Sequence, residues 1–413
     1  MSEPVLAVDF GTSNSAAAIL DGGGPRILRL ERDADTIPTA IFLDYDSRET
    51  LLGEAAIAAM IDGREGRFMR ALKSVLGTSL LHEKRQFMNE RLTLSEIITR
   101  FLVAVKARAE AEAGQRFDRV LAGRPVHFHH RDTGRDAKAA ADLAECYHAA
   151  GFTDVSFLYE PQAAAFAAAG EEPGLGLVVD IGGGTSDFSV FRRAADGGFE
   201  VLANHGIRLG GTDFDRTLSL THVMPLLGKG SQIRAELGPK RHEMPNAIYV
   251  DLATWAKIPF LYSPQVRRDA VRFAKLADER VKLDRLVTVL EDELGHDLAF
   301  ATEHGKIAAN GQADGSEIAL NVIESGLVAP LTADALANDL AASGRAIAEA
   351  AKQCVSMSGV EPADLDRIVL VGGSSLLTAI SDALAPEFPQ ARFERGNAFT
   401  AIIDGLALAT ARG

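Results

Sequence analysis

The sequence predicts an α/β protein built from two related domains, and three observations lead to this fold class. The chain has 413 residues, of which 47% are hydrophobic, whereas a single core stops growing at about 250–300 residues. Short runs typical of β-strands alternate with longer runs of helical periodicity. A strand, a polar glycine turn and a second strand occur twice, near residues 5–20 and 177–191.

The two hairpins have the same pattern. The first consists of the strand Val5–Asp9, a Gly-Thr-Ser turn and a returning strand, Ser15–Leu20. The second consists of Leu177–Asp180, a turn with three consecutive glycines and the strand Phe188–Phe191. They lie about 170 residues apart, which is far too long for a solenoid repeat and instead indicates two related domains.

Further helices and strands are expected between and after the hairpins, from hydrophobic periodicity and flanking turn residues. The expected helices are residues 54–76, 94–114, 135–150 and 332–355. The expected strands are residues 119–128, 155–159, 317–322 and 367–371. From residue 209 to about 310, helical patterns are repeatedly broken by proline, which indicates an inserted helical subdomain.

Composition narrows the classes of function. A formal charge of −14 and a pI near 5.2 disfavour a nucleic-acid partner. Cys146 and Cys354 lie far apart in apolar surroundings, as in a reduced chain without a disulfide framework. The N-terminus lacks the basic and apolar regions of an export signal, and no apolar run reaches the roughly 18 residues of a membrane span. These features predict a soluble cytoplasmic protein that binds neither nucleic acid nor membrane.

The polar turns of the two hairpins are suited to hold a phosphate chain. Glycine has no Cβ and reaches positive φ, so backbone N–H groups can approach a phosphate without obstruction. One such turn alone is more often an ordinary hairpin turn. Two copies, each following a strand-terminal aspartate and each carrying hydroxyls, favour phosphate binding. The residues are Gly11, Thr12, Ser13 and Asn14 after Asp9, and Gly182, Gly183, Gly184 and Thr185 after Asp180.

The aspartates predict a metal ion. Two carboxylates beside a polyphosphate would repel it unless a hard divalent cation with its water shell lay between them, as is typical of magnesium. Two other nucleotide-binding motifs are absent from the sequence. No Gly-Lys-Ser/Thr follows a glycine at the spacing of a Walker A loop, and no GxGxxG dinucleotide fingerprint opens a helix.

The motifs together resemble those of the heat shock protein 70 chaperones, within the superfamily that includes actin and sugar kinases. Leu6–Ser15 is similar to the family's first phosphate motif, and Val178–Val190 is similar to the second. The other similar segments are Ala71–Gly77, Glu160–Ala165, Leu209–Asp215, Glu303–Asn310 and Val369–Ser375. They follow the family's order along nearly the whole chain.

This resemblance implies an actin-like ATPase fold with duplicated ribonuclease H-like domains and inserted subdomains around a nucleotide cleft. Domain I is expected at residues 1–170 plus 397–413, with an insertion at about 39–112. Domain II is expected at residues 171–396, with an insertion at about 212–325. In full-length chaperones a linker, a peptide-binding β-sandwich and a lid follow, so a chain ending at Gly413 is expected to lack them.

The resemblance also implies the roles of individual residues. Lys73 matches the lysine that contacts the γ-phosphate and the attacking water, and Glu160 matches the glutamate that positions the water. Asp180 and Thr185 complete the implied catalytic set. Magnesium is expected near Asp9, Asp180 and Asp187 through water. The implied contacts to ATP or ADP further include Gly210, Gly211, Gly372, Gly373, Ser374 and Ser375.

For the ribose, the resemblance implies Glu303 and Lys306. Glu279 and Lys282 have the same spacing, but an i,i+3 ion pair on a helix is ordinarily a surface feature. The residues after the later pair also match the family's following turn and strand. Leu376 occupies the place where many members have an arginine that stacks on adenine, and leucine cannot supply a planar cation.

The implied function is that of a slow, magnesium-dependent, chaperone-like ATPase whose nucleotide state opens and closes a cleft and thereby affects a protein client or co-chaperone. Two alternatives from the same superfamily stay open. A small-molecule kinase would need a carboxylate base beside a substrate hydroxyl, whereas the implied lysine and glutamate favour hydrolysis. A filament-forming cytoskeletal protein would need self-complementary heterologous surfaces, which a sequence does not display.

Overall fold

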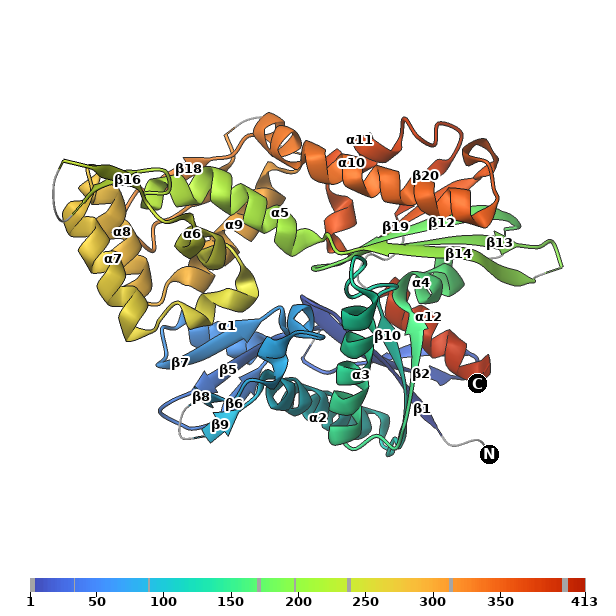
Figure 1. Ribbon diagram of the computed structural model, residues 1–413. Helices are drawn as coiled ribbons and strands as arrows, with labels where there is room; N and C mark the ends of the chain where they lie inside the picture. The colour runs from blue at the N-terminus through green and yellow to red at the C-terminus, as the bar shows by residue number, and fades with distance from the viewer. Residues whose placement is uncertain are drawn as a thin grey trace. The chain divides into compact units, whose positions relative to one another are not determined.

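The computed structural model describes residues 4–32, 34–87, 90–168, 172–196, 198–235, 239–311, 315–395 and 400–412. The chain forms two compact units, one comprising Met1–Gly211 with Gly344–Gly413 and the other Thr212–Ser343. The domain boundaries predicted at 170/171 and 396/397 both lie outside the described residues. Figure 1 labels most of the helices and strands by the names used below.

The first large sheet of the first unit has the strand order β11-β10-β1-β2-β3, with the short β4 paired to β2. Its strands are β1 (Val5–Phe10), β2 (Asn14–Asp21), β3 (Gly24–Leu28), β4 (Ile37–Pro38), β10 (Arg119–Arg124) and β11 (Asp154–Tyr159). Strands β1, β2 and β3 are antiparallel neighbours. Strands β10 and β11 add to β1 in parallel, which requires the crossover helices that the chain supplies between them.

The second large sheet has the order β14-β13-β12-β19-β20. Its strands are β12 (Gly174–Ile181), β13 (Ser186–Arg193), β14 (Phe199–Ile207), β19 (Arg367–Val371) and β20 (Arg392–Arg395). The first three are again antiparallel and the last two again parallel. Counted along the chain, both sheets have the order 3-2-1-4-5. The duplicated α/β design predicted from the two hairpins is therefore confirmed.

Helices α4 (Glu160–Ala168) and α12 (Ala401–Ala409) contribute to the cores of both sheets. Ala163 and Leu406 pack with Ala7 and Ala18 of the first sheet. Ala164 and Ala401 belong to the core of the second sheet. Small residues let the two helices approach closely, and a Cβ on Gly405 would overlap the carbonyl oxygen of Ala163.

The prediction of one helix over residues 54–76 is wrong. Helix α1 (Glu54–Ile61) is followed by strand β7 (Gly66–Arg70) and the 3-10 helix η1 (Leu72–Val75). Gly63 has φ of 65°, a left-handed conformation that ends a helix, and β7 then pairs with β5. Tertiary pairing thus overrides the helical propensity of these residues.

The remaining elements of the first unit surround the sheets. They are β5 (Ala40–Asp44), β6 (Thr50–Leu52), η2 (Ser79–His82), β8 (Arg85–Phe87), β9 (Glu90–Leu92), α2 (Leu94–Ala113), α3 (Thr133–Ala149), η6 (Pro362–Asp364), η7 (Gly373–Leu376), α11 (Thr378–Leu384) and η8 (Thr410–Arg412). Helix α10 (Ala333–Ser358) spans the boundary of the two units. Helix α2 begins with a capping box between Thr93 and Glu96 and ends at Gly114.

The second unit is mainly helical, as its proline-broken patterns predict, but it also contains a small sheet that they do not predict, β15 with β16. Its elements before α10 are α5 (Gly211–Leu218), the π-turn η3 (Ser219–Val223), η4 (Met224–Leu227), β15 (Gln232–Arg234), β16 (Arg241–Glu243), α6 (Asn246–Leu252), η5 (Trp255–Phe260), α7 (Pro264–Leu276), α8 (Arg280–Glu291), α9 (Gly295–Ala309), β17 (Glu317–Ala319) and β18 (Val328–Pro330). No helix within the described ranges is long and apolar enough to cross a bilayer.

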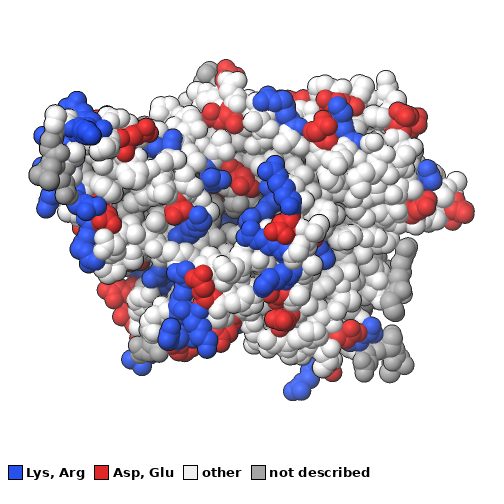
Figure 2. Space-filling model, viewed as in Figure 1, with Lys and Arg blue, Asp and Glu red and all other residues white. Residues whose placement is uncertain are grey.

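Charged side chains of both signs lie on the surface. Figure 2 shows basic and acidic side chains interspersed on the face drawn. Two of the ion pairs of the first unit are Arg85–Glu83 and Arg100–Glu90, with N···O distances of 2.7 and 2.5 Å. Exposed pairs of this kind contribute little to stability.

Candidate functional site

The turns of the two hairpins lie against each other in the first unit. A Cβ added to Gly183 would be 2.6 Å from Ser13 Oγ and 3.0 Å from Thr12 Cβ. A Cβ added to Gly184 would be 3.2 Å from Thr12 Oγ1. The structure thus brings together the two turns that the sequence singles out, although they are far apart along the chain.

Two further glycine segments pack onto the second turn. The amide of Gly211 donates a hydrogen bond of 2.9 Å to the carbonyl of Gly182. A Cβ on Gly210 would lie 2.7 Å from Gly184 N, and a Cβ on Gly211 would overlap Ser374 Oγ. Gly182 N in turn donates to Thr185 O at 3.0 Å. These contacts require bare backbone, so none of these glycines places a side chain between the turn and a ligand.

The turn after β19 also reaches this place. Gly372 has φ of 81°, and a Cβ there would overlap Ile181 O and lie 2.8 Å from Asp180 Oδ1. The Ser375 hydroxyl donates to Gly372 O at 2.7 Å. Gly373 and Ser374 begin the 3-10 helix η7 directly after this turn. In the first turn, a Cβ on Gly11 would overlap the carbonyl oxygen of Asn14, the first residue of β2.

Lys73 and Glu160 form a buried ion pair beside these turns. Lys73 Nζ donates to Glu160 Oε1 at 2.6 Å, and their side chains are 7% and 8% exposed. Gly123 on β10 provides the space for this pair, because a Cβ there would lie 3.2 Å from Glu160 Cγ and 3.6 Å from Asp9 Oδ1. The sequence analysis did not identify Gly123, since a glycine inside a strand is not by itself a sign of function.

The carboxylates of the site influence one another. Burial, with Glu160 as the second cause, raises the pKa of Asp9 to about 7 and that of Asp187 to about 8. Burial and the neighbouring carboxylates also raise the pKa of Asp180 well above its ordinary value. Burial alone would lower the pKa of Lys73, but Glu160 and Asp9 outweigh it and the pKa is raised. Lys73 therefore stays charged among groups that repel one another.

Two carboxylate oxygens lack a hydrogen-bond donor. Asp187 Oδ1 accepts a bond of 2.7 Å from Val126 N. Within the part of the chain that the structure describes, Asp187 Oδ2 and Asp180 Oδ1 are buried and without a hydrogen-bond partner. Orphaned anionic oxygens of this kind fit a cation or its water shell. No three His, Cys, Asp and Glu side chains among the described residues form a direct metal-ligand set.

The raised pKa values predict how stability depends on pH without nucleotide or divalent cations. An aspartate with a raised folded pKa binds its proton more tightly in the folded state, so stability is lost as pH rises from the ordinary value of 3.8 through about 7 for Asp9 and about 8 for Asp187. The melting temperature in EDTA is expected to fall from about pH 5 to about pH 9 by scanning calorimetry. Asp187→Asn should flatten this slope, and an equal slope in both proteins would contradict the assignment.

The residues implied for the ribose lie in the second unit. Lys306 Nζ on α9 donates to Asp215 Oδ1 at 2.6 Å, and both side chains are buried. The rival pair, Glu279 and Lys282, forms an exposed ion pair of 2.5 Å, as expected for i,i+3 neighbours at a helix start. Asp215 ends the matched segment Leu209–Asp215, but its pairing with Lys306 emerges only from the fold.

Comparison with known families agrees with these features. Residues 79–240 match the family model described as Hsp70 protein. The matched range includes Glu160, the second glycine hairpin and the Gly210–Gly211 pair. Proteins of this family are ATP-binding, chaperone-type ATPases, and they generally bind ATP or ADP with Mg²⁺. This part of the chain is therefore similar to the Hsp70 family, and the mixed α/β architecture with two large sheets is consistent with the actin-like ATPase fold of that family.

Proposed function

We propose that this chain binds ATP and Mg²⁺ between its two glycine hairpins and hydrolyses ATP slowly. The observation that carries the proposal is the buried Lys73–Glu160 pair, 2.6 Å between Nζ and Oε1, beside two facing turns of bare backbone. A cation next to unobstructed N–H groups is what a transferring phosphoryl group needs, because its charge spreads over several oxygens.

The turns would hold the phosphates through backbone N–H groups and hydroxyls. Thr12, Ser13 and Thr185 supply the hydroxyls, and the glycines keep side chains out of the way. The proposed phosphate contacts are Gly11, Thr12, Ser13, Asn14, Gly182, Gly183, Gly184, Thr185, Gly210 and Gly211. Close packing between the turns orders these donors before a ligand arrives, so little ordering entropy is lost on binding.

Magnesium fits the orphaned oxygens of Asp180 and Asp187, with the partly buried Asp9 nearby. When bound, it would supply positive charge that offsets the repulsion between these carboxylates and the phosphates. The three aspartates would accept hydrogen bonds from water molecules around it. Burial and the neighbouring carboxylates raise the pKa values of these aspartates, Lys73 offsets this only in part, and a bound cation would lower the values further.

Lys73 and Glu160 would act on the attacking water and the γ-phosphate. The Lys73 ammonium stabilises negative charge that develops on the phosphoryl oxygens. The Glu160 carboxylate, fixed at the start of α4, orients the water and accepts its proton. Burial of both groups excludes bulk water and strengthens their electrostatic effect.

The nucleoside contacts are part of the same proposal. Glu303 and Lys306 are proposed to contact the ribose, and Gly372, Gly373, Ser374 and Ser375 the adenosine. Leu376 would cover the purine face without a cation. We further propose that ATP and ADP shift an opening and closing of the cleft around the site, through their different affinities for its two states. A client or co-chaperone protein would respond to that shift.

Replacing Asp180 with asparagine tests the magnesium assignment. The neutral amide removes one charge from the cation's surroundings, so magnesium-dependent ATP affinity or turnover is expected to fall by about tenfold or more. Titration calorimetry with and without Mg²⁺, together with phosphate-release assays, measures both. Asp154→Asn is the matched control, because Asp154 is exposed and pairs with Arg119. Equal affinity and turnover in wild type and Asp180→Asn would refute the role.

A further inference from the structure

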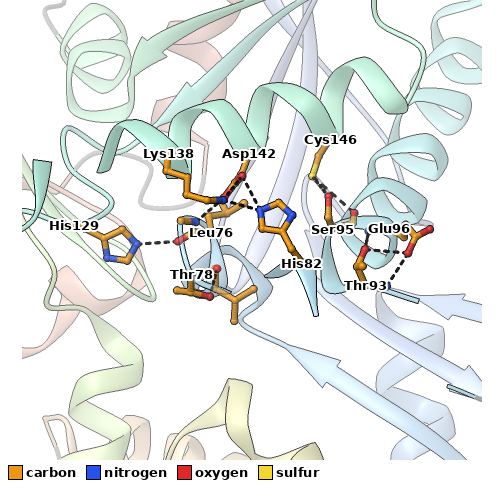
Figure 3. A network of polar contacts seen from close by, with 12 residues as sticks. Leu76, Thr78, His82, Thr93, Ser95, Glu96, His129, Lys138, Asp142 and Cys146 are labelled. Atoms are coloured by element: carbon orange, nitrogen blue, oxygen red, sulfur yellow. Dashed lines mark hydrogen bonds and ion pairs between the residues drawn. The ribbon is translucent and has the colours of Figure 1, made fainter. Parts of the chain in front are cut away.

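A buried aspartate on helix α3, Asp142, connects that helix to the segment that carries Lys73. Its side chain is 5% exposed. Asp142 Oδ2 accepts a hydrogen bond of 2.9 Å from Gly77 N, four residues after Lys73. Lys138 Nζ donates to both carboxylate oxygens, at 2.9 and 3.0 Å. His82 Nε2 lies 3.0 Å from Asp142 Oδ1 (Figure 3).

The segment from Ala71 to Gly77 is shaped by more than this one bond. Ala71 has φ of 60°, a left-handed conformation that costs a non-glycine residue energy. Gly77 has φ of 75°, and a Cβ there would be 2.5 Å from Arg135 O on α3. His129 Nε2 donates to Leu76 O at 2.8 Å. The turn that carries Lys73 therefore begins in a strained conformation and ends against α3.

Asp142 accepts hydrogen bonds from both the Gly77 amide and Lys138. A carboxylate can accept from the Gly77 amide and from Lys138 at the same time, because it has two acceptor oxygens. Without it, the Gly77 N–H loses its acceptor, and Lys138 Nζ stays 2.7 Å from His82 Nε2 with no anion beside it. Asparagine keeps one acceptor but turns an NH₂ group toward Lys138 or His82.

From this geometry we propose that Asp142 is a positioning residue for the ATPase reaction, which holds the Lys73 segment in place through the Gly77 amide. The proposal rests on the proposed function of Lys73. Asp142 does not touch Lys73, so it acts on the backbone that carries it. A misplacement of about 1 Å at a reacting group can cost about 10²-fold in rate, which makes such an anchor measurable.

The test compares Asp142→Ala and Asp142→Asn with Thr93→Ala in the full 413-residue chain. Thr93 lies in the same region (Figure 3) and caps α2 through Glu96, with a bond of 3.1 Å from Glu96 N to Thr93 Oγ1. Thr93→Ala should therefore lower the melting temperature without changing the contact at Gly77. It controls for a general loss of stability.

Three measurements separate positioning from stability. Hydrogen exchange of the amides from Leu72 to Thr78 is expected to become about tenfold faster in Asp142→Ala, and less so in Asp142→Asn. Single-turnover hydrolysis is expected to slow by about tenfold or more, with the Kd for ATP within about twofold of wild type. Thr93→Ala should change neither the exchange of this segment nor the turnover.

Unchanged exchange in Asp142→Ala would overturn the anchoring, whatever the protein's activity. Faster exchange with normal turnover would overturn the positioning role, provided that Lys73→Ala abolishes hydrolysis in the same assay. If Lys73→Ala is itself as active as wild type, the proposed function fails and the exchange result still decides the anchoring. If turnover fell equally in Thr93→Ala and Asp142→Ala, a general loss of stability would account for the slower hydrolysis, and the proposal would be refuted.

Discussion

Replacing Lys73 with alanine is expected to slow ATP hydrolysis by about 10²-fold or more while ATP affinity stays close to that of the wild type. The ammonium lies buried next to Glu160, with Asp9 and Asp187 also raising its pKa, so it is a cation among the carboxylates of the proposed site. In the proposed site the turns would hold the phosphates through backbone N–H groups, which the substitution does not touch. Phosphate release under single-turnover conditions and titration calorimetry provide the two measurements.

Two further variants serve as controls for loss of stability and for removal of a positive charge. Removal of Lys73 leaves Glu160 buried without its partner, and an uncompensated buried charge destabilises a fold. Lys73→Met keeps most of the side-chain volume and should lose hydrolysis to the same extent. Lys282→Ala removes an exposed, paired lysine and should leave turnover unchanged. Wild-type turnover in Lys73→Ala would show that the phosphoryl chemistry lies elsewhere.

Replacing Gly405 with alanine is expected to destabilise the fold by about 3 kcal/mol or more, at the upper end of overpacking effects. The new Cβ would overlap Ala163 O, a backbone atom of α4 that cannot rotate away. Helices α4 and α12 would have to separate, and both contribute to the two sheet cores. Denaturant unfolding followed by circular dichroism measures the loss.

Gly134 offers the matched control for this substitution. Gly134 also lies in a helix, α3. The atom nearest to a Cβ added there would be Asp132 Oδ1 at 3.6 Å, which is an ordinary van der Waals contact. Gly134→Ala should therefore be neutral or stabilise the protein by up to about 1 kcal/mol through helix propensity. If both variants have the same stability, the close approach of α4 and α12 does not limit the fold.

The strands of the two hairpins were predictable because their signal is local. Short apolar runs on either side of a polar glycine turn predict β1, β2, β12 and β13 within a few residues of their observed ends. The segment from Glu54 to Leu76 was mispredicted because its strand, β7, is stabilised by pairing with β5, about 25 residues earlier. Pairing partners at such a distance leave no mark on the periodicity of either segment.

The candidates for the site also depend on local signals. Motifs make the glycine turns, Lys73 and Glu160 candidates because each occupies a recognisable local pattern, and the structure brings these residues together. Gly123 and Asp142 have no such pattern, because only the fold brings them to their partners. Gly123 lies beside the Glu160 side chain, and Asp142 accepts a hydrogen bond from the Gly77 amide. Only the fold shows which side chain supports which.

The matching strand orders of the two sheets have a consequence for the origin of the site. The two sheets share one topology, and their equivalent turns are in contact with each other. An isologous dimer has the same arrangement, because in it a surface patch contacts the same patch of the second copy across a twofold axis. Asp9 and Asp180 occupy equivalent positions at the ends of β1 and β12. Fusion of two such copies into one chain frees each copy to diverge. Lys73 and Asp142 both precede the second sheet in the chain, whereas Asp180 and Asp187 belong to it, so the two copies contribute different residues to the proposed site.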